Sequence, residues 1–482
     1  MQAPAEIPEP REKSPEQEAR TFAPTDREDR SHPVGVESTG FFLNPEREDS
    51  MTILRSLGVG CVISILALSG LPGAMAADRV AIRCGRLLDP GRQQVLKDAV
   101  ILLAQDRIEA VVSDRDIPRD ARVIDLRDRT VLPGLIDAHT HLLLQGDVTA
   151  EDYDSQLLKE SIPYRTLRAV RAARIALSHG FTTLRDVGNE GAGFADVDLK
   201  RAFEAGVVPG PRLFVATKAL APTGAYPLHG YSWELRVPIG VENCDGADAC
   251  RKAVRDQVEH GADWIKVYAD RSYYKDPDGT WKSIPNFTPD EMRAIVEEAH
   301  RLRRRVAAHS MTPSGHQVAL SAGVDSIEHG DVLDEATIRT MVRRHVFLCP
   351  TLSVTAFVAP GRSTTNPIWN DLLEVGKQSF RKALAAGVPI ALGTDAGGFD
   401  WDKINQAEEL HRMTDLGMTP WQAIRAGTTV AAELLGQEGK LGTLAPGAYA
   451  DLIATEGDPL GDISVLENRV VWVMQGGKVF PF

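Results

Sequence analysis

The sequence predicts an α/β protein: a (β/α)8 TIM barrel with a small β-sandwich domain built from both ends of the mature chain. Three observations lead to this class. Strand-like apolar runs alternate with helical segments to give eight βα units between residues 131 and 440. Short strand-and-turn patterns fill residues 77–130 and return in residues 441–482. Glycines close the helices where a left-handed residue is favoured.

The barrel elements follow one another in regular order. The first strand is predicted around residues 131–138. Helical segments include 165–178 and 289–304, and Thr288 stands where it would cap the second of these. The glycines expected at helix ends are Gly180, Gly206, Gly261, Gly323 and Gly387. The seven further strands are predicted at 182–184, 212–216, 264–269, 306–308, 325–327, 346–348 and 389–392.

Composition excludes several classes of protein. The 482 residues are 43% hydrophobic and 25% charged, which is typical of globular enzymes. The net charge is −13, and no basic stretch is present that would bind a phosphate backbone, so nucleic acid is excluded as a partner. Residues 1–50 hold 12 acidic and 6 basic residues and seven prolines. We interpret this segment as a disordered extension that results from an over-long start.

Residues 51–76 have the pattern of a secretory signal peptide. Met51 is followed by Arg55, by an apolar run over residues 57–71, and by Ala74-Met75-Ala76 as a cleavage site. The alternative is a membrane anchor, but glycines and a proline make the run short and broken. We therefore expect a periplasmic or secreted protein with no membrane attachment after cleavage. In that compartment Cys244 and Cys250, six residues apart, form either a small-loop disulfide or two free thiols.

The candidate chemical residues fall at the carboxyl ends of the predicted strands. His139 and His141 are two residues apart, so both side chains leave the same face of the first strand. A lysine lies inside the fourth strand, and the fifth, sixth and eighth strands end in His, His and Asp. All would converge on the mouth of the barrel, where this fold places active sites. The set, which predicts a metal site, is His139, His141, Lys266, His309, His329 and Asp395.

These residues lie in motifs that resemble the metal-dependent amidohydrolase superfamily. The resemblance covers residues 79–482 and is closest to the imidazolonepropionase-like group, which includes Xaa-Pro dipeptidases and secreted amidases such as ochratoxin-cleaving enzymes. The motifs are Pro133-Gly134-Leu135-Ile136-Asp137-Ala138-His139-Thr140-His141, the Lys266 strand, His309, Glu328-His329-Gly330, Gly393-Thr394-Asp395 and the closing segment from Gly442 to Ile453.

The resemblance implies a binuclear zinc centre. Lys266 would be carboxylated by CO2, because a carbamate attracts dications whereas a protonated amine repels them. By this carry-over one zinc is held by His139, His141, Lys266 and Asp395, and the other by Lys266, His309 and His329. Mn2+ or Co2+ would satisfy the same ligands. A metal-bridging hydroxide would attack the scissile carbonyl, and Asp395 would carry its proton to the leaving amine.

Substrate contacts are expected from two places. His229 and Tyr231 lie in the loop after the third strand, and the resemblance places a histidine there to polarise the carbonyl and a tyrosine to bind a carboxylate. Loop packing is the alternative for both. Tyr268 follows Lys266 by two residues and therefore points into the same mouth. The aromatic residues of the 270–285 loop line a rim or pack on the surface.

The function expected is hydrolysis of an amide or peptide bond in dipeptides or N-acyl amino acids, small molecules with a free carboxylate. The alternative is a mononuclear-metal deaminase or cyclic amide hydrolase, against which Lys266 argues. A non-catalytic scaffold is a third hypothesis, but such relatives lack ligands that are present in this sequence. The resemblance is also compatible with a homo-oligomer.

Overall fold

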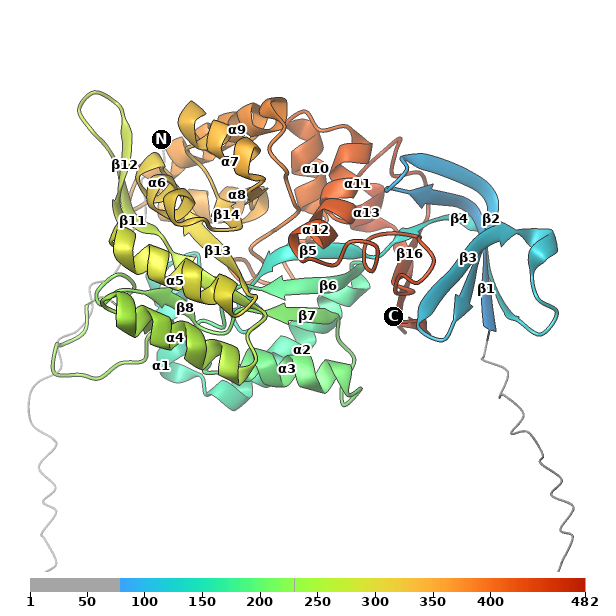
Figure 1. The fold of residues 1–482 in the computed structure, drawn as a ribbon, viewed down its shortest axis with the longest axis horizontal. Coiled ribbons are helices and arrows are strands. Elements are labelled where there is room, and N and C mark those ends of the chain that lie inside the picture. The colour runs from blue at the N-terminus through green and yellow to red at the C-terminus, as the bar shows by residue number, and fades with distance from the viewer. Residues whose placement is uncertain (1–78, 229, 482) are drawn as a thin grey trace, which may run out of the picture. The chain divides into compact units, whose positions relative to one another are not determined.

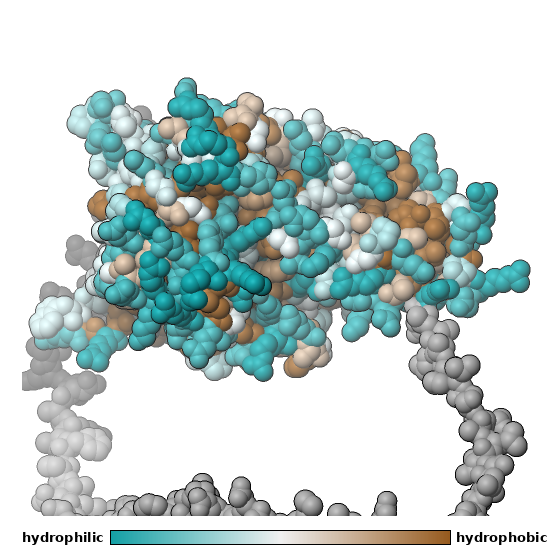
Figure 2. Space-filling model, in the orientation of Figure 1, coloured by the Kyte–Doolittle hydropathy of each residue, from teal (hydrophilic) through white to brown (hydrophobic). Residues whose placement is uncertain are grey.

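The computed structural model describes residues 79–228 and 230–481 (Figure 1). The predicted extension, 1–50, and the predicted signal peptide, 51–76, lie outside the described residues, as does His229. In the described part of the chain, no helix has the length and apolar character needed to cross a bilayer. On the face shown in Figure 2, hydrophilic side chains predominate over the helices, and hydrophobic side chains gather over the small sheet.

Strands from both ends of the described chain form one seven-stranded sheet in the order β18-β17-β16-β4-β1-β2-β3. In the centre, β4 pairs with β1 in parallel and with β16 antiparallel. Figure 1 shows the N-terminal strands in blue beside the C-terminal β16 in red. Alternate side chains of these strands bury a separate core around Ile82, Leu103 and Met474. The strands are β1 (Arg79–Asp89), β2 (Gln94–Ala104), β3 (Arg107–Ser113), β4 (Arg122–Pro133), β16 (Leu452–Thr455), β17 (Val470–Gln475) and β18 (Lys478–Val479), with the short 3-10 helix η1 (Asp114–Asp116) after β3.

Two parallel sheets supply the wall of the barrel. Their orders are β5-β6-β7 and β15-β14-β13-β10-β8-β9. Small side chains such as Ala138, Ala307 and Ala391 fill the interior, and larger apolar side chains face the helices. The strands are β5 (Leu135–Thr140), β6 (Phe181–Asp186), β7 (Arg212–Val215), β8 (Ala219–Ala221), β9 (Val241–Asn243), β10 (Trp264–Tyr268), β13 (Arg305–Ser310), β14 (Ser326–His329) and β15 (Phe347–Cys349).

Backbone hydrogen bonds connect the two sheets at both junctions. Residues 389–396, predicted in part as the eighth strand, lie between β15 and β5. On one side the Leu348 N–H donates to Pro389 O (2.9 Å), and on the other the Ala138 N–H donates to Leu392 O (2.9 Å). At the second junction the Asp263 N–H donates to Val215 O (2.8 Å). The predicted α/β barrel is therefore confirmed, with its eighth strand reduced to isolated bridges.

The helices begin and end where their local sequences predict. Thr288 and Glu291 form a capping box at the start of α5, and Gly261, Gly323 and Gly387 adopt left-handed conformations at the ends of α4, α6 and α9. The helices are α1 (Ala150–Lys159), α2 (Ile162–Ser178), α3 (Ala195–Glu204), α4 (Ala247–His260), α5 (Pro289–Arg301), α6 (Pro313–Ala322), α7 (Glu335–Arg344), α8 (Leu352–Arg362), α9 (Ile368–Ala386), α10 (Glu408–Asp415), α11 (Pro420–Ala426), α12 (Thr429–Leu434) and α13 (Val465–Asn468).

Two further features bear on the site. Residues 270–285, expected as a loop, form an antiparallel hairpin of β11 (Asp270–Lys275) and β12 (Trp281–Pro285) directly after β10. Cys244 and Cys250 form a disulfide between the end of β9 and α4, with their Cα atoms 4.9 Å apart. Of the two alternatives for this pair, the structure has the disulfide.

Candidate active site

The six predicted ligands meet at the carboxyl ends of the barrel strands. Asp395 Oδ1 lies 3.3 Å from His141 Nε2 and 3.7 Å from His139 Nε2. These three side chains are close enough together to hold one ion. Lys266 enters from β10, with its Nζ 3.4 Å from His139 Nε2. The His309 and His329 rings lie 4.6 Å apart, and the His329 ring lies 5.1 Å from that of His139.

A hydrogen bond at the outer nitrogen orients each imidazole. His139 Nδ1 lies 2.7 Å from Glu328 Oε2, and His141 Nδ1 donates to the Gly188 carbonyl at 2.7 Å. His329 Nδ1 lies 2.8 Å from Thr351 Oγ1. Each of these rings therefore turns Nε2 toward the centre, as metal-ligating histidines do when a second group holds Nδ1.

His309 has the opposite arrangement. Its Nε2 lies 2.6 Å from the hydroxyl of Tyr273, on the hairpin β11–β12. Its Nδ1 is consequently the nitrogen left for an ion. The hairpin thus contacts a predicted ligand directly.

Burial controls the charge of these groups. It lowers the pKa of His139, His309 and His329 well below their usual range, which favours the neutral, ligating imidazole. Burial also lowers the pKa of Lys266, and no acidic oxygen of the described residues lies within 4.0 Å of its amine. Both conditions favour the neutral amine of Lys266 over its ammonium form.

The pair His141 and Asp395 behaves differently. Burial alone would lower the pKa of His141, but the hydrogen bond and charge of Asp395 raise it to about 9. Burial alone would raise the pKa of Asp395, but the neighbouring His139 and His141 lower it to about 2. Asp395 is therefore a carboxylate at neutral pH. The neutral imidazoles of His139, His309 and His329, the anionic oxygen of Asp395 and the buried amine of Lys266 are donors that fit divalent metal ions, and an ion would replace the proton on His141.

Four residues around the centre adopt left-handed backbone conformations that are unfavourable for side chains other than glycine. Their φ angles are 50° for Glu190, 71° for His329, 47° for Thr351 and 61° for Asp395. Such strain is concentrated at functional sites because the surrounding structure must enforce it. At His329 the rotation turns the side chain out of the strand alternation and toward the mouth.

A cavity of about 660 Å3 opens over the predicted ligands. Tyr268 lines it as predicted; its hydroxyl donates to Glu190 Oε1 (3.2 Å) and its ring stacks on Tyr226. Tyr231 is 40% exposed, hydrogen-bonds to Asp154 (2.8 Å) and is not among the residues that line the cavity. Its role in substrate binding stays a prediction, as does that of His229.

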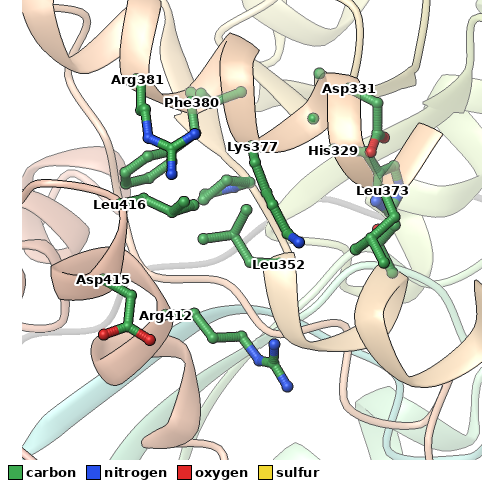
Figure 3. Close-up of a pocket in the computed structure, with 15 residues that line it drawn as sticks. His329, Asp331, Leu352, Leu373, Lys377, Phe380, Arg381, Arg412, Asp415 and Leu416 are labelled. Carbon is green, nitrogen blue, oxygen red and sulfur yellow. The ribbon is translucent and has the colours of Figure 1, made fainter. Parts of the chain in front are cut away.

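A second, smaller cavity of about 290 Å3 lies behind His329, among α8, α9, α10 and the barrel wall. Figure 3 shows Lys377, Arg381 and Arg412 around it, with Phe380 and Leu352 between them. Lys377 is paired with Glu374 and Arg412 with Glu408. His329 and Thr355 line both this cavity and the larger cavity over the predicted ligands.

Several contacts around the ligand candidates were not predicted from the sequence, although Tyr273 was expected on a rim and does line the cavity. Glu328 contacts His139, and the Arg185 guanidinium donates to both oxygens of Glu328 (2.9 and 3.0 Å). Thr351 contacts His329, and Tyr273 contacts His309. Glu190 accepts hydrogen bonds from Tyr153 and Tyr268. The role of Glu328 could have been considered from the sequence, because Glu328 stands next to His329 in the motif Glu328-His329-Gly330.

A barrel mouth that gathers four histidines, a buried lysine and an aspartate defines a metal-dependent hydrolase. Residues 130–480 match the amidohydrolase family, and the chain belongs to this family. It is a hydrolase that acts on carbon–nitrogen bonds, as the sequence predicts.

Three relatives place the chain within the family. It is 32% identical over 433 residues to the ochratoxinase of Aspergillus niger, covering 83% of this chain and 87% of that protein. It is 26% identical over 383 residues to the imidazolonepropionase of Streptomyces coelicolor, covering 74% and 85%. The crystal structure of a Xaa-Pro dipeptidase with methionine bound in the active site superposes with a TM-score of 0.74 at 32% identity, covering 83% of this chain and 99% of that one.

Proposed function

We propose that this protein is a binuclear zinc amidohydrolase that cleaves the amide bond of dipeptides or N-acyl amino acids. The observation that carries the proposal is the position of Lys266. Its buried amine lies 3.4 Å from His139 Nε2. The His139 ring lies 5.1 Å from the His329 ring, which in turn lies 4.6 Å from the His309 ring. A carboxylated Lys266 would supply one anionic oxygen to each of two ions.

The proposed ligand sets share this lysine. His139, His141, Lys266 and Asp395 would hold one zinc, and Lys266, His309 and His329 the other. Mn2+ and Co2+ fit the same nitrogen and oxygen donors. The bound ions supply Lewis acidity and lower the pKa of a bound water toward neutrality.

The protein's own groups then move the protons. Asp395, ionised at neutral pH, accepts a proton from the attacking water and delivers it to the leaving nitrogen, because an amide anion is too basic to depart unprotonated. We assign His229 to the substrate carbonyl oxygen, where it would stabilise developing negative charge. Tyr268, whose aromatic ring lines the cavity, is positioned to contact the substrate.

The relatives support an amide substrate with a free carboxylate. One solved relative, 31% identical, is a prolidase complexed with N-methylphosphonate-L-proline, and another holds methionine in its active site. Both ligands carry an amino-acid carboxylate. The apolar walls of the cavity, which include Leu144, Met311 and Val358, suit a hydrophobic side chain.

Metal stoichiometry and a substrate screen test the proposal together. The protein expressed from Met51 should bind two metal ions per chain and release a C-terminal amino acid from Xaa-Pro, Xaa-Phe or N-acyl amino acid substrates. One ion per chain with no amide cleavage would contradict it. That result would favour the alternative, a mononuclear deaminase or cyclic amide hydrolase.

We also propose that the mature enzyme is exported to the periplasm or secreted. The support is the signal-peptide pattern of residues 51–76 and the Cys244–Cys250 disulfide, which suits an oxidising compartment. Amino-terminal sequencing of the mature protein tests this proposal, and we expect cleavage near Ala76.

A further inference from the structure

Two arginines, Arg271 and Arg362, line the cavity over the metal centre. They come from different elements: Arg271 lies on β11, and Arg362 is the last residue of α8. Their electrostatic situations differ, and the difference indicates which one is available to a ligand.

Arg362 already has an anionic partner. Its Nη2 donates to Asp147 Oδ1 at 2.7 Å and to the Asp147 carbonyl at 2.6 Å, and its guanidinium lies 4.7 Å from the centre of the Trp369 ring. The Asp147 carboxylate therefore neutralises this charge, and binding a second anion there would require breaking the pair.

Arg271 has a neutral partner instead. Its Nη1 donates to the side-chain oxygen of Asn286, and within residues 79–228 and 230–481 no acidic oxygen lies within 4.0 Å of its guanidinium nitrogens. The adjacent Asp270 points away, because it accepts hydrogen bonds from Ser283 (2.7 Å) and from the Met311 N–H (3.2 Å). Arg271 thus keeps an uncompensated positive charge on the cavity wall.

The backbone of the barrel holds the partner amide in place. Asn286 Nδ2 donates to the carbonyl of Tyr268 at 2.9 Å, and its own N–H donates to the Ala269 carbonyl at 2.8 Å. Asn286 therefore presents its oxygen to Arg271 in a fixed orientation at the end of β10. This arrangement preorganises the guanidinium, which lowers the entropic cost of binding a planar anion.

The acidic residues of the cavity do not compete for Arg271. Glu190 is occupied by the hydroxyls of Tyr153 (2.8 Å) and Tyr268 (3.2 Å), and Asp154 is occupied by Tyr231 (2.8 Å). The free charge on this wall is consequently positive.

We propose that Arg271, held by Asn286, binds the terminal carboxylate of the substrate and determines the specificity for amides with a free carboxylate. The inference rests on the proposed amidohydrolase function and deepens it. It gives Arg271 the carboxylate-binding role that the resemblance assigns to Tyr231, whose hydroxyl donates to Asp154 and which does not line the cavity. A guanidinium pairs with a carboxylate through two parallel N–H donors, which fixes orientation as well as affinity. This contact would direct the scissile amide toward Asp395 while the apolar walls receive the side chain.

Paired substrates test the proposal. An N-acyl amino acid or dipeptide that the zinc-loaded enzyme cleaves is compared with its C-terminal carboxamide, in the wild type and in Arg271→Gln. For the carboxylate substrate we expect kcat/KM to fall on the order of 10- to 100-fold, mainly through KM, since a charge-assisted hydrogen bond is lost. For the carboxamide we expect a change of less than about threefold. Lys282→Gln, a cation on the same hairpin that lines a different cavity, is the matched control and should leave both substrates unaffected.

A binding measurement separates this proposal from the proposed function. Calorimetry would use a dipeptide analogue with CH2–NH in place of the amide, which no hydrolase of amides cleaves, as the carboxylate and as the carboxamide. If wild type prefers the carboxylate and Arg271→Gln loses that preference, the subsite stands even when no amide is hydrolysed. If amides are hydrolysed but the variant weakens both forms equally, or neither form, the subsite is refuted and the proposed function survives. Failure of the wild type to bind either form also refutes the subsite.

Discussion

Glu328 holds the ring of His139 from inside the barrel: its Oε2 lies 2.7 Å from His139 Nδ1, and both side chains are fully buried. Arg185 completes the set by donating to both carboxylate oxygens of Glu328. The guanidinium of Arg185 in turn lies 4.4 Å from the centre of the Trp264 ring. Besides the ligand candidates themselves, the metal centre is therefore supported by two buried charged side chains, Glu328 and Arg185.

Replacing Glu328 with Gln is expected to weaken metal binding by about 10- to 100-fold, because the partner that orients His139 loses its charge. Competition with a chromophoric chelator measures the affinity, and circular dichroism checks that the variant is folded. Glu335→Gln, on the exposed surface of α7, is the control. Unchanged affinity in a folded Glu328→Gln protein would show that Glu328 does not support the centre.

Carboxylation of Lys266 makes metal reconstitution depend on CO2. Metal-free protein that receives zinc in CO2-free buffer should regain activity slowly, and added bicarbonate should accelerate the recovery. Lys266→Ala should retain less metal and lose at least about 100-fold in turnover, since a bridging ligand is absent. Recovery at the same rate with and without bicarbonate would argue against a carbamate.

Asp395→Asn should separate binding from catalysis. The amide oxygen still ligates, so most of the metal is retained, but the side chain no longer accepts a proton. Turnover is expected to fall by about 100- to 10,000-fold. Elemental analysis and kcat are measured on the same preparation. Near-normal turnover would remove Asp395 from the mechanism.

Glu409 makes stability depend on pH. It accepts hydrogen bonds from the Leu352 and Ser353 N–H groups (both 2.8 Å) at the start of α8, whose own N-cap residue, Thr351, provides no side-chain cap. Burial raises the pKa of Glu409 from its ordinary value of 4.5 to about 7. Between these two pH values the folded state binds more protons than the unfolded state, so stability falls as pH rises.

From this shift, the wild type should lose about 1 kcal/mol of unfolding free energy between pH 6 and pH 8 through Glu409 alone. The Glu409→Gln side chain does not titrate, so this variant should lose about 1 kcal/mol less unfolding free energy than the wild type between pH 6 and pH 8. Urea unfolding of both metal-free proteins at the two pH values measures the difference. If the unfolding free energies of the wild type and Glu409→Gln changed equally between the two pH values, the raised pKa of Glu409 would be contradicted.

Local sequence signals predicted most of the fold. Strand and helix order, the Thr288 cap and the helix-ending glycines depend on neighbouring residues, and the structure has them where expected. The hairpin after β10 was missed because its pairing passes through the turn around Gly279 without a strong alternating pattern. The eighth strand is irregular because residues 394–398 turn to place Asp395.

In the candidate site, too, some residues could be predicted from the sequence and others could not. The six ligand candidates were predictable because five stand at or just beyond a strand end and Lys266 lies inside a strand, all in recognisable motifs. The contacts that orient these ligands were not predictable, because Thr351, Tyr273 and Arg185 reach their partners only in the folded barrel. Adjacent residues of a strand normally point to opposite faces, so strand alternation would not place both Glu328 and His329 at the centre. The left-handed φ of His329 breaks this alternation and allows both side chains to face the centre.

The seven-stranded sheet has a consequence for biosynthesis. The central strand β4 is completed only when β16 pairs with it, and β16 begins more than 300 residues later, at Leu452. Until that segment leaves the ribosome, the edge of β4 at residues 130–133 offers unpaired backbone groups to other chains. A nascent or prematurely terminated chain is therefore expected to need a chaperone during synthesis, even though the barrel strands have already been made.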